Sequence, residues 1–152
     1  MKKRYFLTTL FSLVGAHAFG FKTEKPKTKK VKARITYYHP YQDKWGSQVA
    51  CPNTKRAKVG TTVAAHPDFR FGQKIIIPEL KGKVGDGAFT VQDRGSWVTK
   101  KKASKGKFYV FDVFVANQKE LVRMCRENPP YMEVEIVGRN SQLPRSGAYT
   151  HM

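Results

Sequence analysis

The stretch FYVFDVFV, residues 108–115, is aromatic or β-branched at every position except Asp112. These residue types favour β-strands, so we predict a strand over residues 109–115. Side chains alternate between the two faces of a strand, and Asp112 would therefore lie on the same face as Val110 and Phe114.

Five further short segments, separated by Gly and Pro, are also predicted to be strands. They cover residues 33–38, 62–65, 73–77, 88–92 and 132–137. One helix is expected before the last strand, because Asn117 and Glu120 form a capping-box-like start and Asn128 precedes two prolines that end it. Its apolar stripe comprises Leu121, Val122, Met124 and Cys125. This pattern predicts a mainly β fold, a small closed barrel of six strands.

The first eighteen residues, 1–18, have the pattern of a secretory signal peptide. Positions 2–4 are basic, positions 5–14 are apolar, and the sequence AHA at 16–18 matches a cleavage site. The alternative is a membrane anchor, but the apolar run is far shorter than the ~20 residues that span a bilayer. We therefore expect an exported protein in the periplasm or outside the cell, with no transmembrane segment after cleavage.

Two segments lack a hydrophobic period. Residues 19–32 are rich in Lys and predict a flexible basic lead-in, and residues 139–152 contain Ser, Asn, Pro and Gly and predict a flexible tail. Residues 33–138 remain as one folded domain, a size that suits a single core. We expect a monomer.

The formal net charge of +18 indicates a polyanionic partner. Behind an export signal the available polyanions are anionic cell-envelope polymers, phospholipid headgroups and the peptide carboxylates of peptidoglycan. Nucleic acid is not expected, because export removes it as a target. The alternative is that the charge serves solubility alone.

Cys51 and Cys125 are the two cysteines. In an oxidising compartment they can form one disulfide. However, Cys125 has the spacing of Leu121 and Met124 on the predicted helix, where a free Cys packs as a small hydrophobe. The sequence leaves both alternatives open, because pairing depends on the distance between the two α-carbons.

Asp112 is the first candidate for chemistry. Its apolar neighbours would remove hydration, which raises the pKa of a carboxyl toward neutrality and lets it hold and donate a proton. The alternative is a structural role, in which Asp112 caps the strand or pairs with a lysine. A buried Asp without such a purpose would be costly.

Asp93 and His66 are further candidates. Asp93 has the spacing of Phe89 and Val91, so we predict that it ends a strand on the apolar face, where Arg94 would favour its ionised form if the side chain reaches it. The alternative is an ordinary turn Asp. His66 follows a predicted strand, and a lone His is more often structural than catalytic.

Neither a metal nor a cofactor is expected. The four His residues do not form a metal-ligand spacing and have no cysteine partners nearby. The sequence also lacks a phosphate-binding Gly loop and a Gly-x-Ser-x-Gly elbow.

Three blocks resemble the double-psi β-barrel group of cell-wall proteins. ARITYYHP (33–40) is similar to the opening strand of this group, VAAHPDFRFGQKIII (63–77) to its second block, and VQDRGSWV (91–98) with FDVFV (111–115) to its third. The group includes rare lipoprotein A, the three-Asp (3D) domain proteins and the barrel of membrane-bound lytic transglycosylase A, with expansins more distant. The resemblance implies a double-psi β-barrel with a groove for glycan.

Functional positions follow from the same resemblance. Asp112 stands where the lytic transglycosylase barrel has its catalytic aspartate, and Asp93 stands where rare lipoprotein A and the 3D proteins carry one. His66 falls where rare lipoprotein A has a His and the 3D pattern has its first Asp. Lys58 stands near the place of an acidic residue in rare lipoprotein A, and this departure favours a binding role.

The resemblance implies one of two functions. The first is lytic cleavage of peptidoglycan glycan strands to 1,6-anhydromuramyl ends, with hydrolysis as a variant. Asp112 would be general acid and then base, Asp93 would stabilise positive charge, and His66 would orient substrate or relay a proton. The second is a non-catalytic, expansin-like glycan-binding barrel. The expected substrate-binding residues are Tyr38, Trp45, Arg94, Trp97 and Lys100, the last within a loop at 96–107 predicted to be a basic flap.

Overall fold

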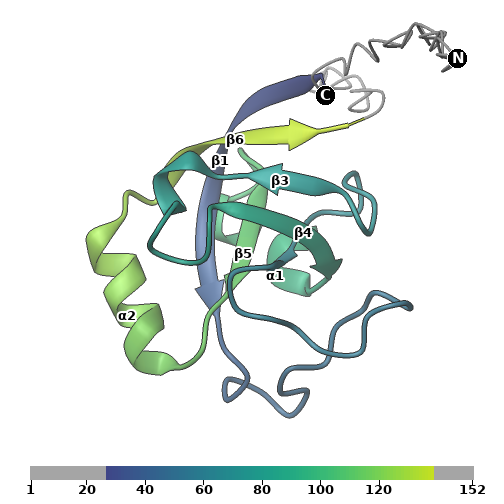
Figure 1. Ribbon diagram of the computed structural model, residues 1–152, viewed down its shortest axis with the longest axis vertical. Coiled ribbons are helices and arrows are strands. Elements are labelled where there is room, and N and C mark those ends of the chain that lie inside the picture. The colour runs from purple at the N-terminus through teal and green to yellow at the C-terminus, as the bar shows by residue number, and fades with distance from the viewer. Residues whose placement is uncertain (1–26, 139–152) are drawn as a thin grey trace, which may run out of the picture.

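The computed structural model describes residues 27–138 (Figure 1). The predicted signal peptide at 1–18 and the predicted tail at 139–152 lie outside the described residues. Within the described range, no helix has the length and apolar character needed to cross a membrane.

The described chain is mainly β, with six strands in one sheet and a single helix longer than one turn (Figure 1). The strands are β1 (Thr28–Tyr38), β2 (Thr62–Ala64), β3 (Lys74–Ile76), β4 (Ala88–Asp93), β5 (Val110–Phe114) and β6 (Tyr131–Val137). The helix α2 (Gln118–Glu127) precedes β6. The predicted mainly β fold, with a helix before the last strand, is confirmed.

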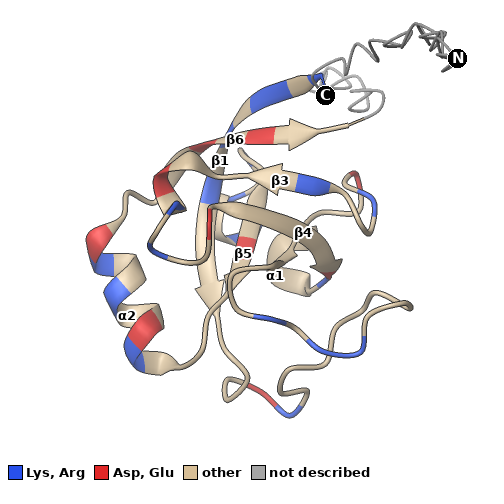
Figure 2. Ribbon diagram, in the orientation of Figure 1, with Lys and Arg blue, Asp and Glu red and all other residues tan. Residues whose placement is uncertain are grey.

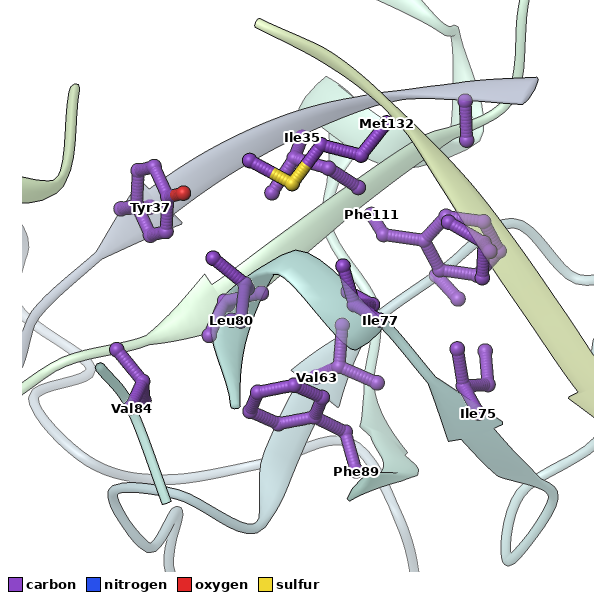
Figure 3. Close-up of a cluster of buried hydrophobic side chains, with 14 of the residues drawn as sticks. Ile35, Tyr37, Val63, Ile75, Ile77, Leu80, Val84, Phe89, Phe111 and Met132 are labelled. Carbon is purple, nitrogen blue, oxygen red and sulfur yellow. The ribbon is translucent and has the colours of Figure 1, made fainter. Parts of the chain in front are cut away.

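Each strand pairs with two others, in the order β1-β5-β2-β4-β3-β6, and the ring closes where β6 pairs with β1. β1 is parallel to β5 and β2 is parallel to β4, whereas the other four pairs are antiparallel. The core includes the buried side chains of Ile35, Phe89 and Phe111 (Figure 3). Because side chains alternate along a strand, the neighbours of these residues face outward.

β1 begins at Thr28, five residues earlier than predicted, so residues 28–32 do not belong to a flexible lead-in. These residues pair with β6 over 133–137, and Lys30 Nζ lies 2.6 Å from a carboxylate oxygen of Glu133. Backbone pairing with β6 and this ion pair stabilise the segment as a strand, although its sequence has no hydrophobic period. The sequence pattern therefore did not reveal its first half.

The start of α2 has the predicted capping-box-like arrangement, with Asn117 as the N-cap. The Asn117 side chain accepts a hydrogen bond from the backbone N–H of Glu120 at 3.0 Å, and the Glu120 carboxylate accepts one from Ala116 at 3.1 Å. Asn128 follows the last helical residue and donates to the Met124 carbonyl at 2.9 Å. Met124 is fully buried and Leu121 is partly buried against the core.

The sequence left open whether Cys51 and Cys125 form a disulfide, and in the structure both are free. The predicted packing of Cys125 in the apolar stripe is wrong, because the buried face of α2 is narrower than that stripe. Cys125 and Val122 are both exposed. Cys51 is the buried cysteine, and its N–H donates to the Gln92 carbonyl at 3.0 Å.

The segment between β4 and β5 is folded onto the outer face of the sheet. It contains the one-turn helix α1 (Ser96–Thr99) and the 3-10 turn η2 (Lys102–Ser104). Val98 is buried against Ala64 and Val110, and Ser104 Oγ accepts from the Phe108 N–H at 3.2 Å. The segment predicted as a basic flap at 96–107 thus has a buried side that packs beside the candidate site.

Candidate functional site

Four outward residues form one row across four neighbouring strands. Thr36 of β1 is paired with Asp112 of β5, Asp112 with Ala64 of β2, and Ala64 with Asp93 of β4. Neighbouring strands are ~4.8 Å apart, so the two aspartate α-carbons are separated by about 10 Å. Ala64 lies between them in this row, and Val98 packs against it.

A β-bulge in β4 determines on which face of the sheet the Asp93 side chain lies. Val63 is paired with Val91, but the next residue, Ala64, is paired with Asp93, so Gln92 is an extra residue in β4. Asp93 therefore faces outward, and its predicted position on the apolar face of Val91 was wrong. A bulge bends a strand and re-aims the side chains that follow it. Gln92 is itself held by Thr62 Oγ1, which donates to its side-chain oxygen at 2.7 Å.

Asp112 lies on the predicted face of β5, together with Val110 and Phe114. Its Oδ1 accepts a hydrogen bond from Thr36 Oγ1 at 2.7 Å. Burial is the main cause that raises the pKa of Asp112 to about 6; the bond from Thr36 opposes this rise, and the charge of Asp93 adds to it. Asp112 can consequently exchange a proton close to neutral pH.

The Asp93 carboxylate accepts three hydrogen bonds. Its Oδ2 accepts from the Tyr38 hydroxyl at 3.0 Å, and its Oδ1 accepts from the backbone N–H groups of Ala50 at 3.0 Å and Arg94 at 2.8 Å. Burial, followed by the charge of Asp93, raises the pKa of Tyr38 above its ordinary value, so this hydroxyl stays protonated and donates. The two aspartates thus have different surroundings and can perform different tasks.

The row lies in a cavity of about 970 Å³. Its lining includes both aspartates and comes from β1, the loop after β1, the start of α1 and the end of α2. Of the predicted substrate-binding residues, Tyr38, Trp45, Arg94 and Trp97 line the cavity, whereas Lys100 does not. Trp45 and Trp97 are 59% and 47% exposed, so their rings are available to stack on a ligand such as a sugar.

Arg94 does not reach the Asp93 carboxylate with its guanidinium group. Its Nη1 donates to the carbonyls of Ala65 at 3.1 Å and Asp93 at 3.0 Å, and its Nη2 donates to the carbonyl of Phe69. The guanidinium carbon also lies 4.1 Å from the centre of the Phe71 ring. Arg94 therefore connects backbone segments around the site, and its guanidinium does not form the contact with the Asp93 carboxylate on which the expected effect depended.

His66 is not brought together with the two aspartates. Its Nδ1 lies 3.2 Å from a carboxylate oxygen of Asp68, and that same oxygen accepts from the Tyr109 hydroxyl at 2.6 Å. None of these three residues lines the cavity. The predicted trio thus separates into an aspartate pair inside the cavity and a His66 cluster outside it.

Several cavity residues were missed by the sequence analysis. They are Arg34, Thr36, His39, Gln42 and Asp43. Thr36 could have been found from strand alternation, because it shares the outer face of β1 with Tyr38. His39 directly follows β1 and is buried, and its Nε2 lies 2.8 Å from Oε1 of Gln118, the first residue of α2. No local sequence pattern reveals this contact.

No group of three or more His, Cys, Asp or Glu residues within 27–138 is arranged to hold a metal ion. Comparison with models of known protein families found no match, and a search of curated proteins found none either. The functional argument therefore depends on the site itself and on the motifs in the sequence.

The coupling between the two aspartates gives a first prediction. Asp93→Asn removes the negative charge that helps to raise the pKa of Asp112, while an Asn oxygen can still accept hydrogen bonds. We expect the pKa of Asp112 to fall below about 6, measured by carbon NMR titration of its carboxyl group. Asp43→Asn is the matched control and should leave this titration unchanged. An unshifted Asp112 in Asp93→Asn would show that the two carboxylates do not interact.

Proposed function

We propose that this protein is an exported lytic transglycosylase that cleaves the glycan strands of peptidoglycan and leaves 1,6-anhydromuramyl ends. The observation that carries the proposal is Asp112, a carboxyl with a pKa raised to about 6 that faces a cavity containing a second aspartate. Such a group can donate a proton near neutral pH and then take one back.

The proposed reaction needs one proton donor. Asp112 gives its proton to the glycosidic oxygen, and the bond between this oxygen and C1 of N-acetylmuramic acid breaks. The 6-hydroxyl of the same sugar forms a new bond to C1 and returns its proton to Asp112. Asp93, across Ala64, would stabilise the positive charge that develops at C1. His66 has no assigned role, because it does not line the cavity.

The finer fold and the location belong to the same proposal. The two parallel pairs, β1 with β5 and β2 with β4, support a double-psi arrangement of the sheet. The pattern at residues 1–18 supports export. Figure 2 shows Lys and Arg residues spread over the strands, the loops and α2. Lysines at residues 100–107 form none of the ion pairs within the described part of the chain, so they are available to anionic envelope polymers.

The test is incubation of the protein with purified sacculi and with peptide-stripped glycan strands, followed by mass spectrometry. We expect new 1,6-anhydromuramyl ends with at least one of these substrates. New reducing muramic acid ends would indicate the hydrolytic variant instead. If no new ends of either kind form, the enzymatic proposal fails.

A second candidate function is a non-catalytic, expansin-like glycan-binding barrel. The exposed rings of Trp45 and Trp97 at the cavity favour it, because they can stack on sugar rings without any chemistry. The same incubation separates the two candidates. A protein that sediments with sacculi but generates no new ends is a binder.

A further inference from the structure

Arg34 lies in the same cavity as the two aspartates. It shares the outer face of β1 with Thr36, whose hydroxyl bonds Asp112. Residues two apart on a strand are separated by about 6.6 Å, so the α-carbon of Arg34 is one such step from that of Thr36. A glycan that presents its scissile bond to Asp112 and extends along β1 would bring a neighbouring group to Arg34.

The guanidinium of Arg34 is held in place on one side. Its Nη1 donates to the carbonyls of Ile35 at 3.1 Å and Pro130 at 3.0 Å, and its central carbon lies 5.6 Å from the centre of the Tyr131 ring. These contacts orient the group without neutralising it. Within residues 27–138 no carboxylate forms an ion pair with Arg34.

The other edge of the guanidinium has no hydrogen-bond partner in the described part of the chain. This edge presents Nε–H and an Nη2–H side by side, the fork that binds a carboxylate through two parallel hydrogen bonds. An oriented arginine with a free edge inside a cavity is suited to an anion. The acidic side chains of Asp43, Asp93 and Asp112 also line the cavity and would repel an anion, so the free edge of Arg34 is the place where a carboxylate is expected.

We propose that Arg34 binds a carboxylate of the glycan substrate and thereby selects acidic, muramic-acid-containing strands over neutral ones. This inference rests on the proposed function. The carboxylate has two sources in peptidoglycan: the lactyl group of a peptide-free N-acetylmuramic acid, or the stem peptide of a substituted one. Arg34 does not touch the reacting atoms and is a specificity-determining residue.

The experiment compares three ligands by calorimetry on the full chain carrying Asp112→Asn, which prevents turnover. The first is a peptide-free oligomer with free lactyl carboxylates, the second is the same oligomer with these groups amidated, and the third carries stem peptides. We expect the amidated oligomer to bind about 10- to 100-fold more weakly than at least one of the other two. The tighter ligand identifies the source of the carboxylate.

Variants then assign the effect to Arg34. Arg34→Met should remove the preference for a carboxylate while it leaves the affinity for the amidated oligomer unchanged, which also shows that the variant is folded. Arg34→Lys keeps the charge without the fork and should retain only part of the preference. The control is Arg126→Met on the exposed side of α2, which should keep the full preference.

Equal affinities for all three ligands in the unmodified Arg34 protein would overturn the inference, and this comparison does not depend on the folding of any Arg34 variant. A preference that survives Arg34→Met would also overturn it. If 1,6-anhydromuramyl ends form but no preference exists, only this inference fails. If the protein neither cleaves nor binds any of the glycans, the proposed function fails with it.

Discussion

Asp112→Asn is expected to lower the rate of formation of 1,6-anhydromuramyl ends by about 10²- to 10⁴-fold, the range for loss of a general acid. The amide keeps the size of the side chain, and its oxygen can still accept the hydrogen bond from Thr36. It cannot supply a proton to the glycosidic oxygen. The change should therefore act on the chemical step, with little effect on the affinity for glycan strands.

The pH dependence of the unmodified protein tests the same assignment. Because burial raises the pKa of Asp112 to about 6, the protonated form decreases about tenfold for each pH unit above that value. The rate should follow this decrease, and the residual rate of Asp112→Asn should not. Asp86→Asn makes the same charge change in an exposed turn and should retain the full rate. A variant at Asp112 that keeps more than a tenth of the rate would contradict its role as the acid.

Most of the strands could be predicted, because the buried strands have a regular pattern of apolar residues in the sequence. In β5 the residues on both sides of the sheet are buried, and the resulting apolar run marks the strand directly. The lysine-rich start of β1 could not be predicted in this way. It is a strand because β6 supplies hydrogen bonds and Glu133 supplies an ion pair, and both partners are more than 100 residues away in sequence.

The candidate site was predicted only in part, because side-chain alternation is regular in β5 but is interrupted in β4. β5 has no irregularity, so alternation places Asp112 correctly beside Val110. β4 contains an extra residue at Gln92, and counting alternate positions therefore gave the wrong face for Asp93. Gln92, the extra residue of the bulge, is held by hydrogen bonds from Thr62 and Cys51, which lie 30 and 41 residues earlier in the sequence.

The remainder of the site depends on loops that have no periodic pattern. The residues that line one part of the cavity come from the loop after β1, where Trp45 and Ala50 follow no strand or helix repeat. Ala50 reaches the site because its N–H donates to Asp93. The separation of His66 from the aspartates has a similar origin, since its neighbour Asp68 and the more distant Tyr109 hold it in a different cluster.

Asp112→Asn should also make the protein more stable at pH 8, by about 2–3 kcal/mol in the free energy of unfolding. A carboxyl with a pKa of 3.8 when unfolded and about 6 when folded binds more protons in the folded state between these values. The free energy of unfolding therefore falls as the pH rises from about 4 to 6, and above pH 6 the ionised Asp112 destabilises the folded state by the full amount. Asn is neutral at every pH, so it does not cause this destabilisation.

Guanidinium unfolding at pH 4 and pH 8 measures this effect. At pH 4 the wild-type Asp112 is already protonated in the folded state, so the gain from Asn should be close to zero, and it should grow through the interval up to pH 6. Asp86→Asn again provides the same change in net charge without burial and should show no such growth. An equal gain at both pH values would mean that packing, and not the buried charge, causes the stabilisation. If Asp112→Asn loses activity and also gains stability as the pH rises, Asp112 is a residue that lowers the stability of the protein but is needed for its reaction.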